Sequence, residues 1–187
     1  MILDYKDIND LNRYKIMSGT VIPRPIAWIV TQDNGVLNAA PFSYFIPISS
    51  NPALLIVAIG QKDDGSPKDS LANILKTKKA TICFVNKENV DQVQKCAMQL
   101  GKDESEIEKF EIEVKEIMDG FPPMIASSQS ALFCEYYDTY EIPGDTTPVV
   151  LELKYQFIED DRINERNHIN VENIGRCGVT FKALVDL

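Results

Sequence analysis

The chain has 187 residues, of which 44% are hydrophobic and 25% charged, and its formal net charge is −9. This composition is typical of a folded globular protein, and the length predicts one domain over residues 1–187. The acidic balance argues against nucleic-acid binding, because a phosphate backbone requires a basic patch. No apolar run approaches the roughly 20 residues of a membrane-spanning helix, and the N-terminus lacks a signal-peptide pattern. We therefore expect a cytoplasmic protein that binds neither nucleic acid nor a membrane.

The cysteines are spread along the chain without a CxxC pair, which argues against a zinc site. Three of them lie in apolar segments, so we expect free thiols rather than disulfides, as in a reducing compartment. The cysteines are Cys83, Cys96, Cys134 and Cys177.

The first third of the chain predicts one short helix followed by strands. The helix spans Tyr5–Met17 and ends at Gly19, since glycine readily adopts the positive φ of a helix terminus. The Asp33-Asn34-Gly35 sequence favours a tight hairpin turn for a similar reason. The strand expected over Ala53–Ile59 is apolar throughout and should be buried on both faces. The expected strands are Ile26–Thr31, Val36–Tyr44 and Ala53–Ile59.

The remainder predicts short helices between further strands. A helix around Leu71–Leu75 would be capped by Ser66 or Asp69. The mostly acidic stretch Lys102–Glu116 is interpreted as a solvated helix or loop face. Pro143-Gly144-Asp145 is a turn signal between two long strands. The other expected elements are a helix over Val90–Leu100 and strands over Ala80–Val85, Ala131–Tyr140, Val149–Ile158 and Val179–Leu184.

These helices and strands do not alternate regularly, as they would in a parallel α/β sheet. We therefore predict a mainly β fold of the α+β class, with an antiparallel barrel and short peripheral helices.

Familiar catalytic signatures are absent from the sequence, including GxGxxG, the Walker A loop, HExxH and GxSxG. The only histidine, His168, lies in a polar segment and fits a surface or structural role better than a catalytic one. An enzyme with few acid–base groups can leave the chemistry to a cofactor and supply binding and orientation. We therefore assign no catalytic side chain and no metal ligand.

Small polar and turn residues concentrate between residues 38 and 52. Ala39 and Ala40 would let a flat ring approach the backbone, and Pro41 indicates an interrupted or edge strand. Ser49–Asn51 supply hydroxyls and an amide for a polyol chain or a phosphate. The alternative interpretation is a proline-rich turn between two core strands.

The segment Lys68-Asp69-Ser70, at a predicted helix start, is a second candidate site. Unpaired backbone amides, the positive end of the helix dipole, a lysine and a hydroxyl together suit a phosphate. The alternative interpretation is ordinary helix capping.

In chain order, these segments resemble motifs of the flavin reductase-like, FMN-binding split-barrel family, whose members include flavoredoxins. The family's central motif is usually N-L-A-P-F-S-Y-F, and this chain has N-A-A-P-F-S-Y-F. A later motif is usually K-D-T-L-x-N-I, and this chain has K-D-S-L-A-N-I. The segments that carry the resemblance are Pro23–Thr31, Asn38–Phe45, Ser49–Pro52, Lys68–Ile74 and Ile174–Gly178, the last resembling a closing R-x-G-G motif.

The resemblance implies a homodimeric split barrel that binds FMN, or FAD in its place, near the subunit interface. The residues implied to face the isoalloxazine ring are Asn38, Ala39, Ala40, Pro41, Phe42 and Ser43. Those implied for the ribityl and phosphate region are Ser49, Ser50 and Asn51, with Lys68 and Ser70 at the phosphate and Arg24 as a further contributor.

The resemblance also implies an NAD(P)H-dependent flavin oxidoreductase. Hydride would pass from the nicotinamide co-substrate to the bound flavin, and electrons would continue to free flavin, a partner oxygenase or another acceptor. Two alternatives stay open: a flavoredoxin-type electron-transfer protein without nicotinamide activity, and a ferric reductase on the same scaffold. The sequence does not indicate the choice between NADH and NADPH or the physiological acceptor.

Overall fold

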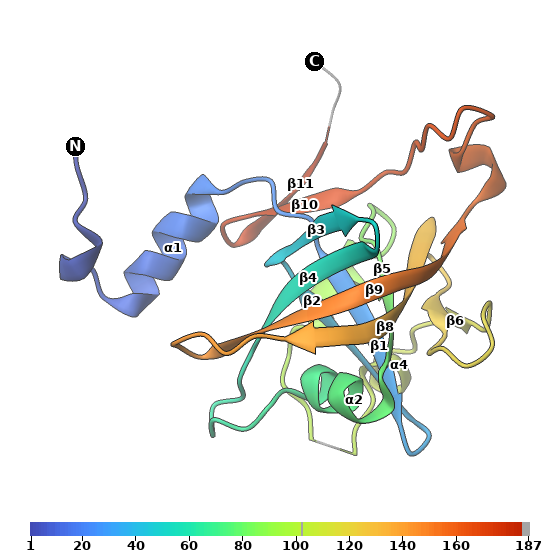
Figure 1. Cartoon of the computed structure of the whole chain (residues 1–187), viewed down its shortest axis with the longest axis horizontal. Helices are drawn as coiled ribbons and strands as arrows, with labels where there is room; N and C mark the ends of the chain where they lie inside the picture. Colours follow the sequence, from blue (N-terminus) through green and yellow to red (C-terminus); the bar gives the residue numbers. More distant parts are fainter. Residues whose placement is uncertain (102, 185–187) are drawn as a thin grey trace.

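An antiparallel sheet of seven strands forms the centre of the computed structural model, which describes residues 1–101 and 103–184 (Figure 1). Its strands are β1 (Ala27–Asp33), β2 (Val36–Phe42), β3 (Phe45–Ser50), β4 (Ala53–Gly60), β5 (Lys79–Cys83), β8 (Ser130–Thr139) and β9 (Thr146–Ile158). Their order across the sheet is β2-β1-β5-β8-β9-β4-β3. The Ala58 N–H donates to the Tyr44 carbonyl over 2.9 Å, so β4 meets the connection from β2 to β3 and the sheet closes on itself. This confirms the predicted antiparallel barrel.

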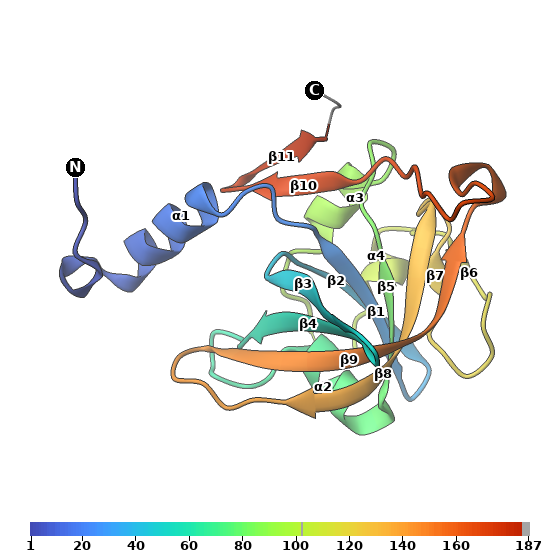
Figure 2. The ribbon, with the colours of Figure 1, turned by 45° about the horizontal axis from the view of Figure 1, so that its top comes forward.

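Smaller elements surround the barrel. Two-stranded ribbons are formed by β6 (Val114–Lys115) with β7 (Met124–Ile125), and by β10 (Ile174–Cys177) with β11 (Thr180–Ala183). The helices are α1 (Asp10–Thr20), α2 (Asp69–Thr77), α3 (Val90–Lys95) and α4 (Glu106–Lys109), with single 3-10 turns at Tyr5–Asp7 and Asp160–Arg162. Figure 2 shows α1 projecting from the barrel beside the β10–β11 ribbon. No helix of the described residues is long and apolar enough to cross a bilayer.

The core lies on both faces of β1 because successive strand residues point to opposite sides. Trp28 and Val30 pack in one apolar cluster with Val93 and Ile107, which come from the helices outside the barrel. Alternate residues of β1, including Ile29, join a second cluster that also contains residues of β4 and α2. The outer helices thus hold β1 and its neighbour β2 in place from one side while the barrel interior holds them from the other.

The expectation that the third predicted strand is buried on both faces is wrong. In β4, Leu55, Val57 and Ile59 are buried, whereas the alternating residues are only half-buried. The helices that cover the outer face of β1 pack over β2 instead of β4. An uninterrupted apolar run therefore does not by itself establish two buried faces.

Several predicted boundaries also differ from the structure. Helix α1 begins later than expected, because the Asn9 side chain accepts from the Asn12 N–H and caps it, and it continues through Gly19. Helix α3 ends at Lys95 rather than Leu100, since the next backbone bonds have three-residue spacing and end the α-helical pattern. Strand β3 is not among the predicted strands, because its Pro47, Ser49 and Ser50 are residues typical of turns.

Candidate functional site

A groove opens between β2 and the start of α2. Asn38, Ala40, Pro41 and Phe42 line it from β2, and Lys62, Lys68, Asp69 and Ser70 line it from the segment around the start of α2. Residues 96–100, which follow α3, form another wall. Strand β2 stands at one end of the strand order, so it carries Pro41 at the edge position that the sequence predicted.

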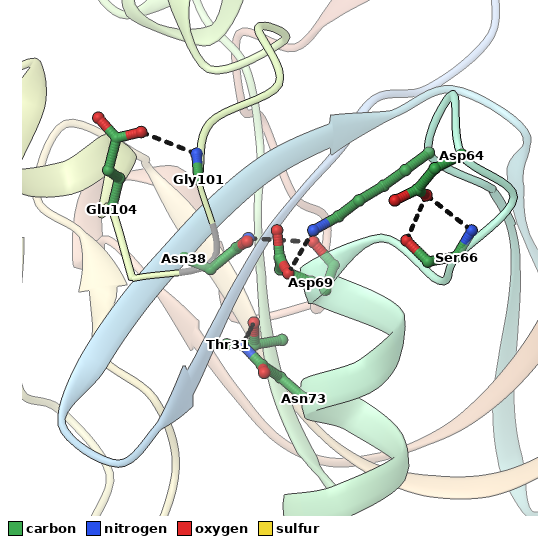
Figure 3. A network of polar contacts seen from close by, with 10 residues as sticks. Thr31, Asn38, Asp64, Ser66, Asp69, Asn73, Gly101 and Glu104 are labelled. Atoms are coloured by element: carbon green, nitrogen blue, oxygen red, sulfur yellow. Dashed lines mark hydrogen bonds and ion pairs between the residues drawn. The ribbon is translucent and has the colours of Figure 1, made fainter.

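Polar contacts fix the end of the groove near α2. The Asn38 amide donates to Ser70 Oγ over 3.1 Å, and both side chains are buried (Figure 3). Lys62 Nζ lies 2.8 Å from Asp69 Oδ1, which leaves that carboxylate neutralised. The structure therefore brings Asn38 of one motif together with Lys68 and Ser70 of the other.

Helix α2 begins without a side-chain cap. Lys68 occupies the N-cap position and makes no capping hydrogen bond, so the expectation that Ser66 or Asp69 caps this helix is wrong. The Ser66 hydroxyl instead contacts Asp64 Oδ1 at 2.6 Å (Figure 3). Because the first turn of a helix has no internal acceptors for its N–H groups, these donors remain available beside the groove.

Glu106 is a groove residue that the sequence interpretation missed. Only 6% of it is exposed, and its Oε2 accepts from the Ala39 N–H over 3.0 Å. Burial raises the pKa of Glu106, and the Ala39 N–H partly offsets that shift. The interpretation of this acidic stretch as a solvated face is therefore wrong at Glu106, although its neighbours Glu104 and Glu108 are exposed.

The groove continues along β2 into a second pocket. Pro41, Phe42 and Ala97 border both. The second pocket is further lined by Tyr14, Ile26, Ser43, Val93, Gln94, Arg176 and Phe181. A ligand lying along β2 would thus have one polar end at α2 and the other end beside the β10–β11 ribbon.

Comparison with known proteins decides the family. Residues 17–170 match the model of the flavin reductase like domain. The chain belongs to this family. An uncharacterized protein of Halalkalibacterium halodurans is 31% identical over 145 residues, which cover 77% of this chain and 69% of the relative.

Solved structures share the fold of this flavin reductase-like chain. Nitrilotriacetate monooxygenase component B from Bacillus cereus has a TM-score of 0.93 at 22% identity, covering 100% of this chain and 96% of that one. Pseudomonas fluorescens 2-nitrobenzoate 2-nitroreductase NbaA has a TM-score of 0.89 at 22% identity, with 100% and 93% covered. An FMN-binding protein from Thermus thermophilus has a TM-score of 0.79 at 16% identity, with 97% and 96% covered. The split-barrel fold that the motifs implied is thereby confirmed.

Arg24 in this flavin reductase-like chain is buried and connects three segments by hydrogen bonds. Its guanidinium donates to the carbonyls of Ser18, Val21 and Gly178 and to Ser43 Oγ, the last over 3.4 Å. These bonds tie the end of α1 and the turn of the β10–β11 ribbon to the residue that follows β2. A direct contact between Arg24 and a flavin stays a prediction.

The Ser49–Asn51 segment lies apart from both pockets within one chain. It is exposed at the β3–β4 hairpin, where Ser49 Oγ accepts from the Asn51 N–H over 3.2 Å. Lys62 follows the opposite end of β4, and the eight residues of that strand span roughly 25 Å. The assignment of Ser49, Ser50 and Asn51 to a flavin stays a prediction, and one chain alone does not place them beside Lys68.

The remaining candidates carry no catalytic arrangement. His168 is exposed, as the surface interpretation expected. Cys96 borders the groove, but burial and the nearby Glu106 carboxylate raise the pKa of its thiol to about 12, so it is protonated at neutral pH. Within the described residues all the cysteines are free, which agrees with the sequence prediction.

Proposed function

We propose that this chain binds FMN in the groove along β2, with the phosphate at the start of α2 and the ring toward Pro41 and Phe42. The observation that carries the proposal is the uncapped first turn of α2 opening into the same groove as Lys68 and Ser70. Open backbone N–H groups, a helix dipole and a lysine form a site suited to a phosphate. Lys62 pairs with Asp69 and offsets its negative charge, which reduces the repulsion between that carboxylate and a phosphate bound at the start of α2.

The middle of the groove suits a flat aromatic ring. Ala40 is small and half-buried, and Phe42 provides an apolar contact on the same face of β2. The backbone contributes little hydrogen bonding at Ala39 and Pro41, since the Ala39 N–H is bound by Glu106 and proline has none. Orientation of the ring would then depend on Asn38 at one end and Ser43 at the other.

The chemistry that we propose is hydride and electron transfer. A bound flavin supplies the redox capacity, accepting a hydride from a reduced nicotinamide and releasing electrons to an acceptor. The chain would contribute binding, orientation and exclusion of water. Free flavin delivered to an oxygenase is the acceptor that we favour, because a similar structure is component B of a monooxygenase.

We also propose that the protein is a homodimer. Leu11, Tyr14 and Met17 are exposed along α1, and Ile46 and Ile48 are exposed on β3. Large apolar side chains gathered on a projecting helix and on an edge strand are typical of a surface that a partner covers. A second copy of the chain would bury both features at once.

Nicotinamide oxidation tests the reductase function. The protein loaded with FMN is mixed with NADH or NADPH under anaerobic conditions, and the flavin absorbance near about 450 nm is followed, first without and then with excess free FMN. We expect one nicotinamide to bleach the bound flavin and then to reduce the free flavin catalytically. Bound FMN that neither nicotinamide reduces would contradict this function and leave the electron-transfer alternative.

A further inference from the structure

Arg176 stands over the second pocket in a defined orientation. Its direct partner across the β10–β11 ribbon is Phe181, and the guanidinium carbon lies 4.4 Å from the centre of that ring. Its Nε donates to the Gly178 carbonyl over 3.3 Å. Within residues 1–101 and 103–184 no ion pair or further side-chain hydrogen bond involves the guanidinium. Its terminal nitrogens thus remain available as donors.

The backbone holds this ribbon tightly against the barrel. Arg24 and Arg176 exchange two backbone hydrogen bonds, of 3.0 and 2.8 Å. A Cβ added to Gly175 would lie 2.7 Å from Pro23 Cβ, so only glycine permits this approach. Arg176 is therefore carried on a rigid element and not on a loose tail, even though the ribbon is near the end of the described chain.

The residues around Arg176 favour an anion. Tyr14, Ser43 and Gln94 add polar groups, and none of the described lining residues of this pocket is acidic. The contrast with the groove near α2, which contains Asp69 and Glu106, is clear. A guanidinium positioned over an aromatic ring, as Arg176 is over Phe181, presents paired N–H donors that match carboxylate and phosphate geometry.

We propose that this pocket binds the anionic group of the second redox substrate, with Arg176 as its anchor. The inference rests on the proposed function, because a flavin with its phosphate at α2 places its ring at Pro41 and Phe42, where the two pockets meet. A substrate held by Arg176 would lie beside that ring. The ligand chemistry is a planar molecule bearing a carboxylate or phosphate, which fits either a nicotinamide dinucleotide or an aromatic carboxylate.

The test compares Arg176→Gln with Lys182→Ala in the FMN-loaded protein. Lys182 is an exposed cation on the neighbouring strand β11, paired with Gly175, so it is a matched control for the loss of one positive charge. The probes are NAD⁺ and benzoate, titrated separately while the absorbance of the bound flavin is recorded. Arg176→Gln should weaken binding of at least one probe about tenfold or more, Arg176→Lys should recover part of it, and Lys182→Ala should change it less than about threefold.

The outcomes separate this inference from the proposed function. An Arg176-dependent loss for NAD⁺ identifies a dinucleotide site, and a loss for benzoate alone identifies a carboxylate substrate; both support the pocket. Unchanged binding of both probes overturns it. If Arg176→Gln instead weakens FMN much more than riboflavin, the flavin phosphate lies at Arg176 and the inference is wrong. A wild-type protein that binds no flavin refutes the proposed function itself.

Discussion

Lys68→Ala probes the position of the flavin phosphate with one surface change. Lys68 is the half-buried N-cap of α2, and no ion pair involving it is present among the described residues. A hydrogen bond to a charged group contributes about 1.5–3 kcal/mol, and each 1.4 kcal/mol corresponds to about tenfold in affinity. Because Lys68 is partly solvated, we expect the lower part of that range, a loss of about 10- to 30-fold for FMN. Riboflavin lacks the phosphate and should lose less than about threefold.

The assay is quenching of flavin fluorescence on titration with protein. Lys76→Ala is the control. Lys76 lies on the same helix, but its Nζ pairs with Asp33 Oδ1 over 2.6 Å, and neither residue lines the groove. Adding Ser70→Ala to Lys68→Ala should deepen the preference against FMN, but it leaves the buried Asn38 amide unpaired at a cost of about 1–3 kcal/mol in stability. A thermal melt must therefore accompany the double variant. Equal losses for FMN and riboflavin in Lys68→Ala would refute a phosphate at this helix.

Other changes test the rest of the account. Burial raises the pKa of Glu106 in the folded state, so the folded protein binds that proton more tightly than the unfolded chain does. The free energy of unfolding should therefore fall as pH rises above the ordinary Glu pKa. Urea unfolding between about pH 4 and pH 8 should show a smaller fall in this free energy for Glu106→Gln than for the wild type, and parallel curves would contradict the assignment. Leu11→Glu with Met17→Glu should convert a dimer to monomers in analytical ultracentrifugation, whereas an unchanged sedimentation coefficient would place the interface elsewhere. A thiol reagent should modify Cys177 first in the native protein, because burial raises the pKa of the other thiols to about 12, and rapid reaction of a second cysteine would show that the core opens.

Local sequence signals predicted local structure well. The hairpin between β1 and β2 is one example, since Asn34 and Gly35 have φ angles of 50° and 85°, as the Asn-Gly turn requires. The long strands β8 and β9 were also predicted close to their observed bounds. Both depend on neighbouring residues alone, so one sequence is enough to recognise them.

Features that depend on distant contacts were not predictable in the same way. Strand β3 exists because it pairs with β4, although its own residues include Pro47 and two serines, Ser49 and Ser50, that suggest a turn. The buried Glu106 carboxylate accepts a hydrogen bond from the Ala39 N–H of the edge strand β2. The two residues are 67 positions apart, so a local pattern does not predict this contact. The Ser105 hydroxyl caps α4 by accepting from the Glu108 N–H, but a cap residue does not reveal where its helix packs.

The candidate site shows the same division. The family motifs implied separate roles for Asn38 at the flavin ring and Ser70 at the phosphate, and these roles stay predictions; the structure joins the two side chains by a hydrogen bond. Motif order also grouped Ser49–Asn51 with Lys68, yet the length of β4 separates them within one chain. The order of the motifs indicates which segments are candidates for the binding site, whereas the register of the barrel strands determines which of those segments line the same groove.

The measurement that most directly tests the central claim is equilibrium dialysis of the purified chain against FMN, with the absorbance spectrum of the retained flavin recorded. FMN should be retained with a shifted flavin spectrum, and riboflavin should be retained more weakly because it lacks the phosphate proposed to bind at α2. A protein that retains no FMN at tens of micromolar, or that retains FMN and riboflavin equally, would contradict the flavin site described along β2.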